Sequence, residues 1–552
     1  MKLFRRFKKQ LMYLGIALVL IVPTAAVSDE YFEISKNLDI FVTLFKEVNT
    51  YYVDPTDPGK LMRKAIDEML KTLDPYTDYI SESEIEDYRF TITGAYGGIG
   101  SQIGIRDNEI IITDPYENSP AQKSDLRPGD VILEIDGINM IGKSTSDASK
   151  LLKGQPKTKL KIKIKREGEG NMMKEVEREE IKVKNVPYYG MINDKVGYIK
   201  LRDFRSDAGN DVANALKELN EKNPSIKGVI LDLRGNPGGL LIEAVNVVNV
   251  FSPKNQLVVS TKGKVKEWEK EYKTMQIPVD ENIQVVVLTN RGSASASEIV
   301  SGTIQDLDRG IVIGQRSFGK GLVQSTRSLS YNTQLKVTTA KYYTPSGRCI
   351  QALDYSHRNE DGSVGEIADS LKKAFKTKNG RKVFDGGGIT PDIKVDEVKY
   401  SAVTQSLMAK QLVFDFASKY YKEHKTIAQP KDFKITDVDF EDFVSFVSSK
   451  NYDYKTKTEK QLEELKKKAE EEKYFESIKA EYEKLKTELY NNKKSDVLKY
   501  KDEIKILIER EIVKRYYHER GTYENSWDDD PDILQAVKAI NDDALFNKLL
   551  KP

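Results

Sequence analysis

The chain has 552 residues, which at about 100–200 residues per domain is enough for three or four domains. Hydrophobic residues make up 39% and charged residues 32%, a balance typical of a folded protein with a highly charged surface and not of a disordered chain or a membrane bundle. Five of the 88 basic residues and none of the 86 acidic ones lie within residues 1–28, so the remainder is close to neutral and we expect no nucleic-acid partner.

The chain is poor in residues that bind metals. Its single cysteine, Cys349, rules out an intrachain disulfide and a cysteine-rich zinc site. The chain has three histidines, His357, His424 and His518, and their spacing is not that of metal ligands. We therefore expect no metal and no other cofactor.

The amino terminus has the pattern of a targeting segment. A basic start is followed by about 12 apolar residues, Leu11–Val22, and then by small residues through Ala26 and Ser28. A membrane span needs roughly 20 apolar residues, so residues 1–28 are predicted to be a signal peptide, with an uncleaved amino-terminal anchor as the alternative. Both place the body outside the cytoplasm, in the periplasm or at the cell envelope.

Residues 29–92 show apolar side chains at helical spacing in two runs, separated by a turn signal at Asp54–Gly59. This pattern predicts an amino-terminal helical segment. Such a hairpin can pack on the body or on a second copy of the chain, so we expect a homo-oligomer as one outcome.

Residues 93–184 are predicted to form short strands behind a glycine-rich opening. The opening consists of Tyr96, Gly97, Gly98, Ile99 and Gly100, and the run Leu126–Gly137 reads L-R-P-G-D-V-I-L-E-I-D-G. A glycine loop alone is usually just a turn, but together with this run it resembles a PDZ domain. In such a domain the loop amides hold a peptide's terminal carboxylate and the next strand pairs with the peptide backbone.

Residues 185–400 alternate between strand, loop and helix, which predicts a buried sheet with crossover helices. Such folds place their sites where strands end and helices begin. Residues 401–552 read instead as a charged helical extension, whose charge runs are interpreted as solvated faces.

A serine-rich segment follows one of the strands in this α/β region. In Gly292–Glu298, Ser293 or Ser295 could simply cap the next helix, with Glu298 as the capping-box acid. A hydroxyl at a helix amino terminus also lies where free amides stabilise an anion, so Ser295 is a candidate nucleophile and the Ala296 amide a candidate oxyanion donor.

A base for this serine is available at Lys320, which lies between two glycines and close to apolar residues. Burial lowers the pKa of a lysine and makes it usable as a base, and Gln324 could orient the amine. Two other interpretations are an exposed turn lysine and a P-loop, but the P-loop needs Ser or Thr at position 321, where this chain has glycine.

In chain order the PDZ-like run, the segments Val229–Gly239 and Gly292–Glu298, and F-G-K-G-x-x-Q at Phe318–Gln324 resemble the carboxy-terminal processing peptidases, also called tail-specific proteases. The resemblance covers about residues 30–400. It implies an α/β multi-domain protein with a PDZ domain and a crotonase/ClpP-like Ser-Lys protease core. It also implies Ser295 as nucleophile, Lys320 as base, Gln324 as its orienting partner and an oxyanion hole formed by the Gly239 and Ala296 amides.

The expected function is therefore an exported serine endopeptidase that recognises the carboxy termini of protein or peptide substrates and cleaves near them, with an adaptor protein as a further candidate partner. A non-catalytic PDZ scaffold that binds protein tails at the cell envelope is the alternative. A metal hydrolase is a weaker third hypothesis. The expected domains are residues 1–28, 29–92, 93–184, 185–400 and 401–552.

Overall fold

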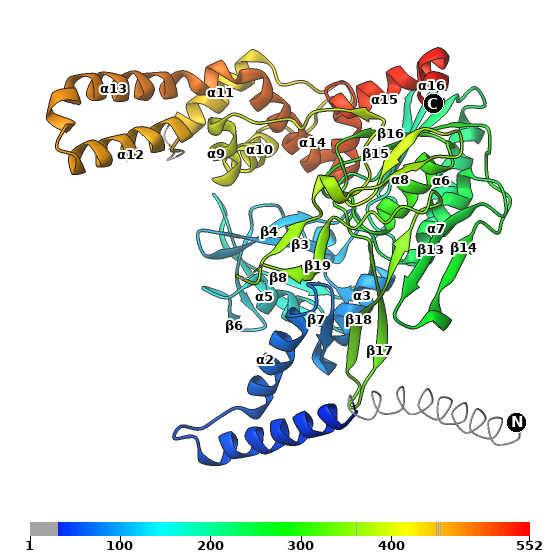
Figure 1. The fold of residues 1–552 in the computed structure, drawn as a ribbon. Helices are drawn as coiled ribbons and strands as arrows, with labels where there is room; N and C mark the ends of the chain where they lie inside the picture. Colours follow the sequence, from blue (N-terminus) through cyan, green and yellow to red (C-terminus); the bar gives the residue numbers. More distant parts are fainter. Residues whose placement is uncertain (1–30, 360, 449, 451, 453) are drawn as a thin grey trace, which may run out of the picture. The chain divides into compact units, whose positions relative to one another are not determined.

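The computed structural model describes residues 31–552 except 360, 449, 451 and 453 (Figure 1). The predicted signal peptide, residues 1–28, lies outside the described residues. The chain divides into two compact units, one ending at Tyr79 and the other covering Ile80–Pro552. Residues 80–92, which the sequence places with the amino-terminal helices, therefore belong to the larger unit.

The smaller unit contains the predicted helices. Residues 31–51 are helical, and α2 (Pro58–Lys71) begins after Asp57, whose side chain accepts a hydrogen bond from the Lys60 amide. Proline at the first helical position suits a helix start, because it lacks an amide that would otherwise have no acceptor. Strand β1 (Asp78–Ile80) lies at the boundary of the two units.

The PDZ region forms a small antiparallel sheet in the order β3-β4-β5-β7-β8, with β6 on β5, and a separate β2–β9 pair. Ile110, Ile112, Ile132 and Ile162 are fully buried in its core together with α5. Helix α3 (Ile85–Thr93) leads into this region. The strands and helices are β2 (Ala95–Gly98), β3 (Ser101–Arg106), β4 (Glu109–Pro115), α4 (Pro120–Lys123), β5 (Val131–Ile135), β6 (Ile138–Asn139), α5 (Thr145–Leu152), β7 (Lys159–Arg166), β8 (Gly170–Glu177) and β9 (Glu179–Lys182).

The region predicted to be the protease core is built on a six-stranded sheet in the order β10-β11-β12-β15-β16-β23, in which every pair but β10–β11 is parallel. Its strands are β10 (Tyr188–Asn193), β11 (Val196–Lys200), β12 (Gly228–Asp232), β15 (Gln284–Thr289), β16 (Ile311–Gly314) and β23 (Ile393–Lys394). The crossover helices are α6 (Ala208–Lys222), α7 (Leu241–Phe251) and α8 (Ala296–Asp306). The predicted buried sheet with crossover helices is confirmed.

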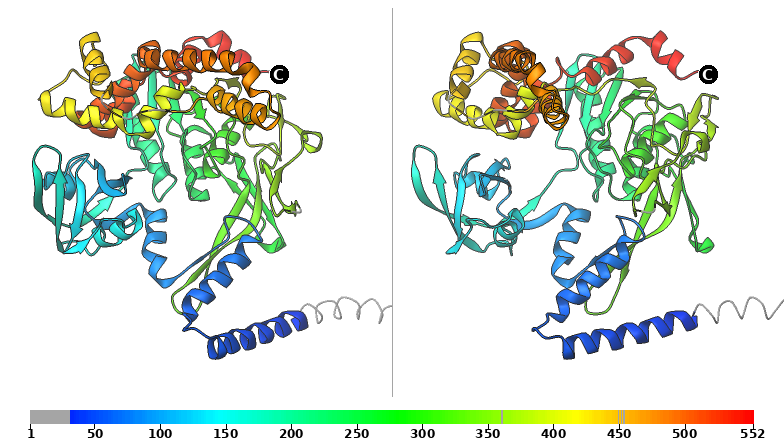
Figure 2. Two further views of the ribbon diagram at one scale, coloured as in Figure 1. Left: turned by 90° about the vertical axis from the view of Figure 1, so that its left-hand side faces the viewer. Right: turned by 60° about the vertical axis from the view of Figure 1, so that its left-hand side comes forward.

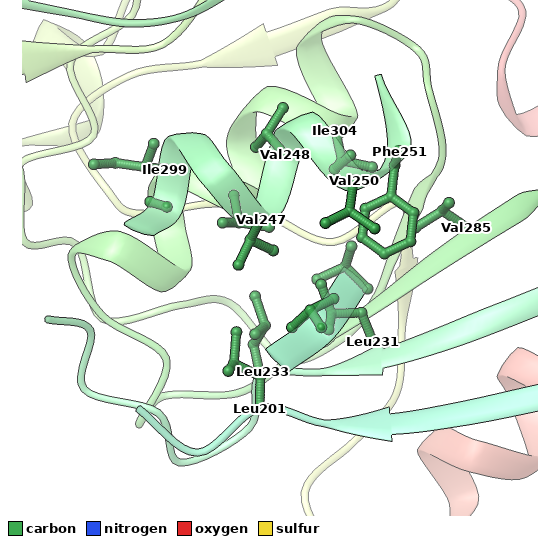
Figure 3. Packing of buried hydrophobic residues seen from close by; sticks show 14 of the residues in the cluster. Leu201, Leu231, Leu233, Val247, Val248, Val250, Phe251, Val285, Ile299 and Ile304 are labelled. Carbon is green, nitrogen blue, oxygen red and sulfur yellow. The ribbon is translucent and has the colours of Figure 1, made fainter. Parts of the chain in front are cut away.

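The two faces of this sheet are covered by different parts of the chain. Leu231 and Val285 point to one face, where side chains of α7 and α8 gather over them (Figure 3). Ile230 and Val286 point to the other face, against Ile533 of the carboxy-terminal segment. Because neighbouring strand residues alternate sides, both faces of a parallel sheet need a cover.

A second, antiparallel sheet pairs β17 with β18, β18 with β13 and β13 with β14. Its strands are β13 (Leu257–Gly263), β14 (Lys270–Lys273), β17 (Leu322–Ser328) and β18 (Gln334–Tyr343). Two hairpins follow, formed by β19 (Leu353–Arg358) with β20 (Val364–Glu366) and β21 (Ala374–Lys376) with β22 (Lys382–Phe384).

The carboxy-terminal segment is helical, as expected, but it is more than a charged extension. Helices α9 (Ala402–Ala409), α10 (Leu412–Glu423), α11 (Asp437–Ser448) and α14 (Lys501–Asn525) share an apolar core, and α12 (Lys457–Glu471) packs on α13 (Phe475–Lys499). Helix α15 (Pro531–Asn541) contacts β12, β15 and β16, and α16 (Asp543–Leu549) follows it (Figures 1 and 2). Among the described residues, no helix combines the length and apolar character that crossing a membrane requires.

Candidate active site

Ser295 lies where the sequence predicts it, between the end of β15 and the first residue of α8. Its φ is 55°, in the left-handed region that a residue with a side chain rarely occupies. Such strain persists only where surrounding bonds impose it, and it is concentrated at functional sites. The turn into α8 thus holds Ser295 in a conformation that the residue would not adopt by itself.

The carboxylate of Glu298 joins the Ser295 turn to the loop that carries Lys320. Its Oε2 accepts hydrogen bonds from the Ser295 amide at 2.8 Å and from the Lys320 amide at 2.9 Å. Its Oε1 accepts from Ser317 Oγ at 2.6 Å and from the Gly319 amide at 2.7 Å. One side chain therefore holds the backbones of the two predicted catalytic residues side by side.

Glu298 is fully buried, and burial raises its pKa to about 6 although its four donors favour the charged form. The sequence interpretation assigned Glu298 only a capping role. The bond from the Ser295 amide to Glu298 is the one expected of a capping-box acid. The bonds to Ser317, Gly319 and Lys320 cross about 20 residues of chain, and no local pattern signals them.

The loop after β12, Leu233–Gly239, lies against the Ser295 turn; we call it the β12 loop. The carbonyl of Asn236 accepts hydrogen bonds from the Ala294 amide at 3.0 Å and from Ser297 Oγ at 2.9 Å. A Cβ on Gly238 would lie 2.9 Å from the Ala296 nitrogen, so only glycine allows this approach.

The two predicted oxyanion-hole amides lie on these two neighbouring segments. Gly239 ends the β12 loop and Ala296 is the first residue of α8. Within the described part of the chain, neither amide donates a hydrogen bond to a protein acceptor. Both are thus available to a bound oxyanion.

The start of the β12 loop contains a buried ion cluster that the sequence interpretation missed. Asp232 accepts from Tyr198 Oη at 2.7 Å, Lys200 Nζ at 3.2 Å and Arg234 Nη2 at 2.7 Å. Burial acts to raise the pKa of Asp232, but Arg234 and Lys200 hold it below its usual range. Arg234 also bonds to Asp530 and Asp532, about 300 residues later.

Lys320 is half-buried, and its neighbour Phe318 is half exposed, so the apolar enclosure expected from the sequence is partial. Gln324 lies on β17, and its Nε2 donates to Thr338 Oγ1 at 3.1 Å. The orienting role of Gln324 toward Lys320 stays a prediction.

The predicted tail-binding segment, Tyr96–Gly100, is in part a strand. Residues 96–98 belong to β2 and pair with β9, and the Ile99 and Gly100 carbonyls accept hydrogen bonds from the Ala121 and Tyr116 amides. Close packing also explains a glycine here, because a Cβ on Gly97 would lie 2.0 Å from the Gly154 carbonyl oxygen.

The histidines lie on separate elements. Each has a hydrogen-bond partner: His357 bonds to Asp354, His424 to the Tyr420 carbonyl and His518 to Gln122. Across residues 31–552, leaving aside the four undescribed positions, no group of three His, Cys, Asp or Glu side chains could hold a metal ion.

Three families match separate parts of the chain. Residues 195–355 match Peptidase family S41, residues 111–166 match the PDZ domain, and residues 403–540 match the C-terminal helical domain described as that of a probable PDZ-protease. These matches follow the order of the PDZ region, the protease core and the carboxy-terminal helices.

Known proteins with similar sequences are proteases. The carboxy-terminal-processing protease of Bartonella bacilliformis is 35% identical over 344 residues, which is 62% of this chain and 78% of that protein. A probable CtpA-like serine protease of Staphylococcus aureus is 31% identical over 373 residues, which is 66% of each chain. Nothing in these similarities supports a non-catalytic scaffold.

Among solved structures, the photosystem II D1 C-terminal processing protease is 26% identical and aligns with 64% of this chain and 92% of its own, with a TM-score of 0.36. The PDZ domain of a Vibrio cholerae carboxy-terminal protease in complex with peptide is also 26% identical, covers 16% of this chain and has a TM-score of 0.16.

Proposed function

The chain belongs to the carboxy-terminal-processing proteases of Peptidase family S41, which are serine peptidases, and from this membership we propose that Ser295 and Lys320 are its catalytic pair. The observation that carries the proposal is the bond of one Glu298 oxygen to the amides of both residues. That oxygen holds the backbone amides of the two residues next to one another, one at the start of α8 and the other in a different loop.

In the proposed reaction, Lys320 Nζ accepts the Ser295 proton while Ser295 Oγ attacks the carbonyl carbon of the scissile peptide bond. The amides of Gly239 and Ala296 stabilise the oxyanion. Lys320 then gives the proton to the leaving amine, and an acyl-enzyme forms. Water repeats the sequence, with Lys320 again as base, and releases the acid and Ser295. Gln324 is proposed to orient the lysine amine.

The PDZ region is proposed to capture the free carboxy terminus of a protein substrate. Strand β3 is the end strand of its sheet, where it pairs only with β4, and α5 contacts both β3 and β5. A peptide that added a strand to this open edge would bring its terminal carboxylate toward Gly98–Gly100, at the start of β3. This geometry supports the segment Tyr96–Gly100 as the tail-binding site.

The amino-terminal pattern supports export to the periplasm or cell envelope, by a cleaved signal or an uncleaved anchor. The helix at residues 31–51 exposes large apolar side chains, including Phe32, Leu38, Phe41 and Leu44. An exposed apolar surface of this kind supports pairing with a second copy or with an adaptor protein.

Ser295→Ala is the direct test of the catalytic assignment. A purified Ser295→Ala protein should neither digest fluorescein-labelled casein nor react with an alkyl fluorophosphonate, while its circular dichroism and thermal unfolding match the parent. Retained cleavage would reject Ser295 as nucleophile. Mass spectrometry of fragments from a test protein, with its terminal carboxylate free or amidated, tests tail recognition; equal cleavage of both forms would reject it.

A further inference from the structure

Arg234 lies at the start of the glycine-rich part of the β12 loop. Its guanidinium donates hydrogen bonds to two parts of the chain that are far apart in sequence. Nε and Nη2 donate to Asp232, at the end of β12. Nη1 donates to both Asp530 oxygens, at 2.9 and 2.8 Å, and to Asp532 Oδ2 at 2.9 Å. Arg234 thus joins the end of β12 to the carboxy-terminal helical segment.

The two distal carboxylates are themselves held firmly. Asp530 is the N-cap of α15, and its Oδ1 accepts from the amides of Asp532 and Ile533 at 3.0 and 3.2 Å. Asp532 is buried and its Oδ1 accepts from Gln315 Nε2 at 3.3 Å. Because α15 is packed on the sheet, neither carboxylate can follow a guanidinium that moves.

Side-chain packing alone does not determine the position of Arg234. A cavity of about 380 Å³ is lined by Arg234 together with Tyr198, Lys200, Asp530 and Asp532. Since the guanidinium borders open space, charge-assisted hydrogen bonds rather than close contacts set its position.

The loop that begins at Arg234 is bonded or packed along its length as far as the proposed nucleophile, Ser295. Lys200 Nζ donates to the Arg234 carbonyl at 2.6 Å, and the next amide, Gly235, donates to Asn290 Oδ1 at 2.9 Å. Further along the same loop, a Cβ on Gly238 would lie 2.9 Å from that of Ser295. The β12 loop has no spare room beside the nucleophile, so a small shift changes where the Gly239 amide points.

We propose that Asp530 and Asp532 are positioning residues for peptide-bond hydrolysis. Through Arg234 they hold the β12 loop in the geometry that aims the Gly239 amide at the oxyanion. The carboxy-terminal helical segment is therefore part of the catalytic unit and not an appendage. This inference rests on the proposed role of Gly239 in the oxyanion hole.

The test is the double substitution Asp530→Asn with Asp532→Asn in the full chain. Asparagine keeps the α15 cap and the side-chain volumes but removes the two charges of the carboxy-terminal segment that face Arg234, and it leaves Asp232 in place. With labelled casein we expect kcat to fall about 10- to 100-fold and KM to change less than about two-fold, because an oxyanion contact acts mainly in the transition state. The rate of fluorophosphonate labelling of Ser295 should fall in parallel.

Asp543→Asn is the matched control. Asp543 also joins the carboxy-terminal segment to the core, through Lys227 at 3.0 Å and Gln284 at 2.8 Å, but these partners lie at the start of β12 and β15, at the opposite end of the strands from the β12 loop. We expect parental kcat and labelling rate. An equal loss in this control, or a rise in KM at constant kcat in the double variant, would overturn the proposal.

A second variant covers the case in which the double substitution prevents folding. Asp532→Asn alone leaves the Asp530 cap unchanged and should reduce kcat by a smaller factor, about 3- to 10-fold; parental rates in a folded Asp532→Asn protein would reject the inference. Ser295→Ala is measured alongside. If it retains activity the catalytic assignment fails, whereas an inactive Ser295→Ala with parental rates in the aspartate variants refutes only the positioning role.

Discussion

The loops around the proposed catalytic serine and the proposed tail-binding segment are held in place by different kinds of bonds. Around Ser295 the holding bonds are made by side chains: Glu298 accepts from the Lys320 amide, Asn236 Nδ2 donates to the Leu201 carbonyl, and Arg234 donates to Asp532. The segment Tyr96–Gly100 is held instead by main-chain pairing between β2 and β9. Side-chain substitutions should therefore disturb the first region, and only changes that alter the backbone should disturb the second.

The largest expected effect is from Lys320→Arg. The guanidinium stays protonated at any working pH and cannot accept the serine proton, so kcat should fall about 10³-fold or more. Casein digestion by the purified variant measures this loss, with unchanged circular dichroism as the control for folding. Activity within tenfold of the parent would show that Lys320 is not the base.

Glu298→Gln should lower kcat about 10²-fold, because an amide cannot accept hydrogen bonds at both ends from the Ser295, Gly319 and Lys320 amides. It should also change the pH profile. The parent pKa of about 6 means that Glu298 gains a proton below that pH and loses acceptor capacity, so the acid limb of kcat/KM steepens there. The steepening should vanish in the variant, and its persistence would assign it to another group.

The same carboxyl contributes to stability with a defined sign. Its folded-state pKa lies above the ordinary 4.5, so the folded chain binds this proton more tightly than the unfolded chain. The contribution to the free energy of unfolding is fully present below about pH 4.5 and is lost as pH rises through about 6. It amounts to about 2 kcal/mol and is absent from Glu298→Gln. Comparing urea unfolding of parent and variant at pH 4 and pH 7 measures it.

Gly97→Ala tests the backbone-held region. The new Cβ would lie 2.0 Å from the Gly154 carbonyl oxygen, so we expect the β2–β9 pair to be destabilised by about 1–3 kcal/mol. Hydrogen exchange of the β2 and β9 amides, read by mass spectrometry, should accelerate. Binding of a fluorescein-labelled peptide with a free carboxy terminus should weaken about tenfold.

Gly168→Ala is the control for this substitution, since a Cβ there meets no atom within 4 Å although φ is positive. It should cost about 1 kcal/mol locally and leave β2–β9 exchange unchanged. Equal acceleration in both variants would mean that close packing at Gly97 has no special role.

The smallest expected effect is from Lys514→Ala, which removes the 3.2 Å ion pair between α14 and Asp114 of the PDZ region. This pair is partly exposed to solvent, so its loss should cost about 1 kcal/mol or less and lower Tm by about 2 °C. A much larger drop in thermal unfolding experiments would reveal that α14 and the PDZ region stabilise one another strongly.

The sequence determined the elements and the local chemistry of this protein. Strand-loop-helix alternation predicted the sheet edge on which Ser295 lies. The glycine spacing predicted the PDZ region, and the charged residues 401–552 predicted the helices, because these signals depend on near neighbours in the chain. Only the tertiary structure decided which residues hold the site together. Glu298 meets Lys320 and Arg234 meets Asp530 across separations of about 20 and 300 residues, and a carboxylate destined for such a bond looks in sequence like any cap or surface charge. The tertiary structure also decided that α15 covers the second face of the sheet. An apolar face like that of α15 occurs in every amphipathic helix, and the sequence does not show which distant strands it packs on.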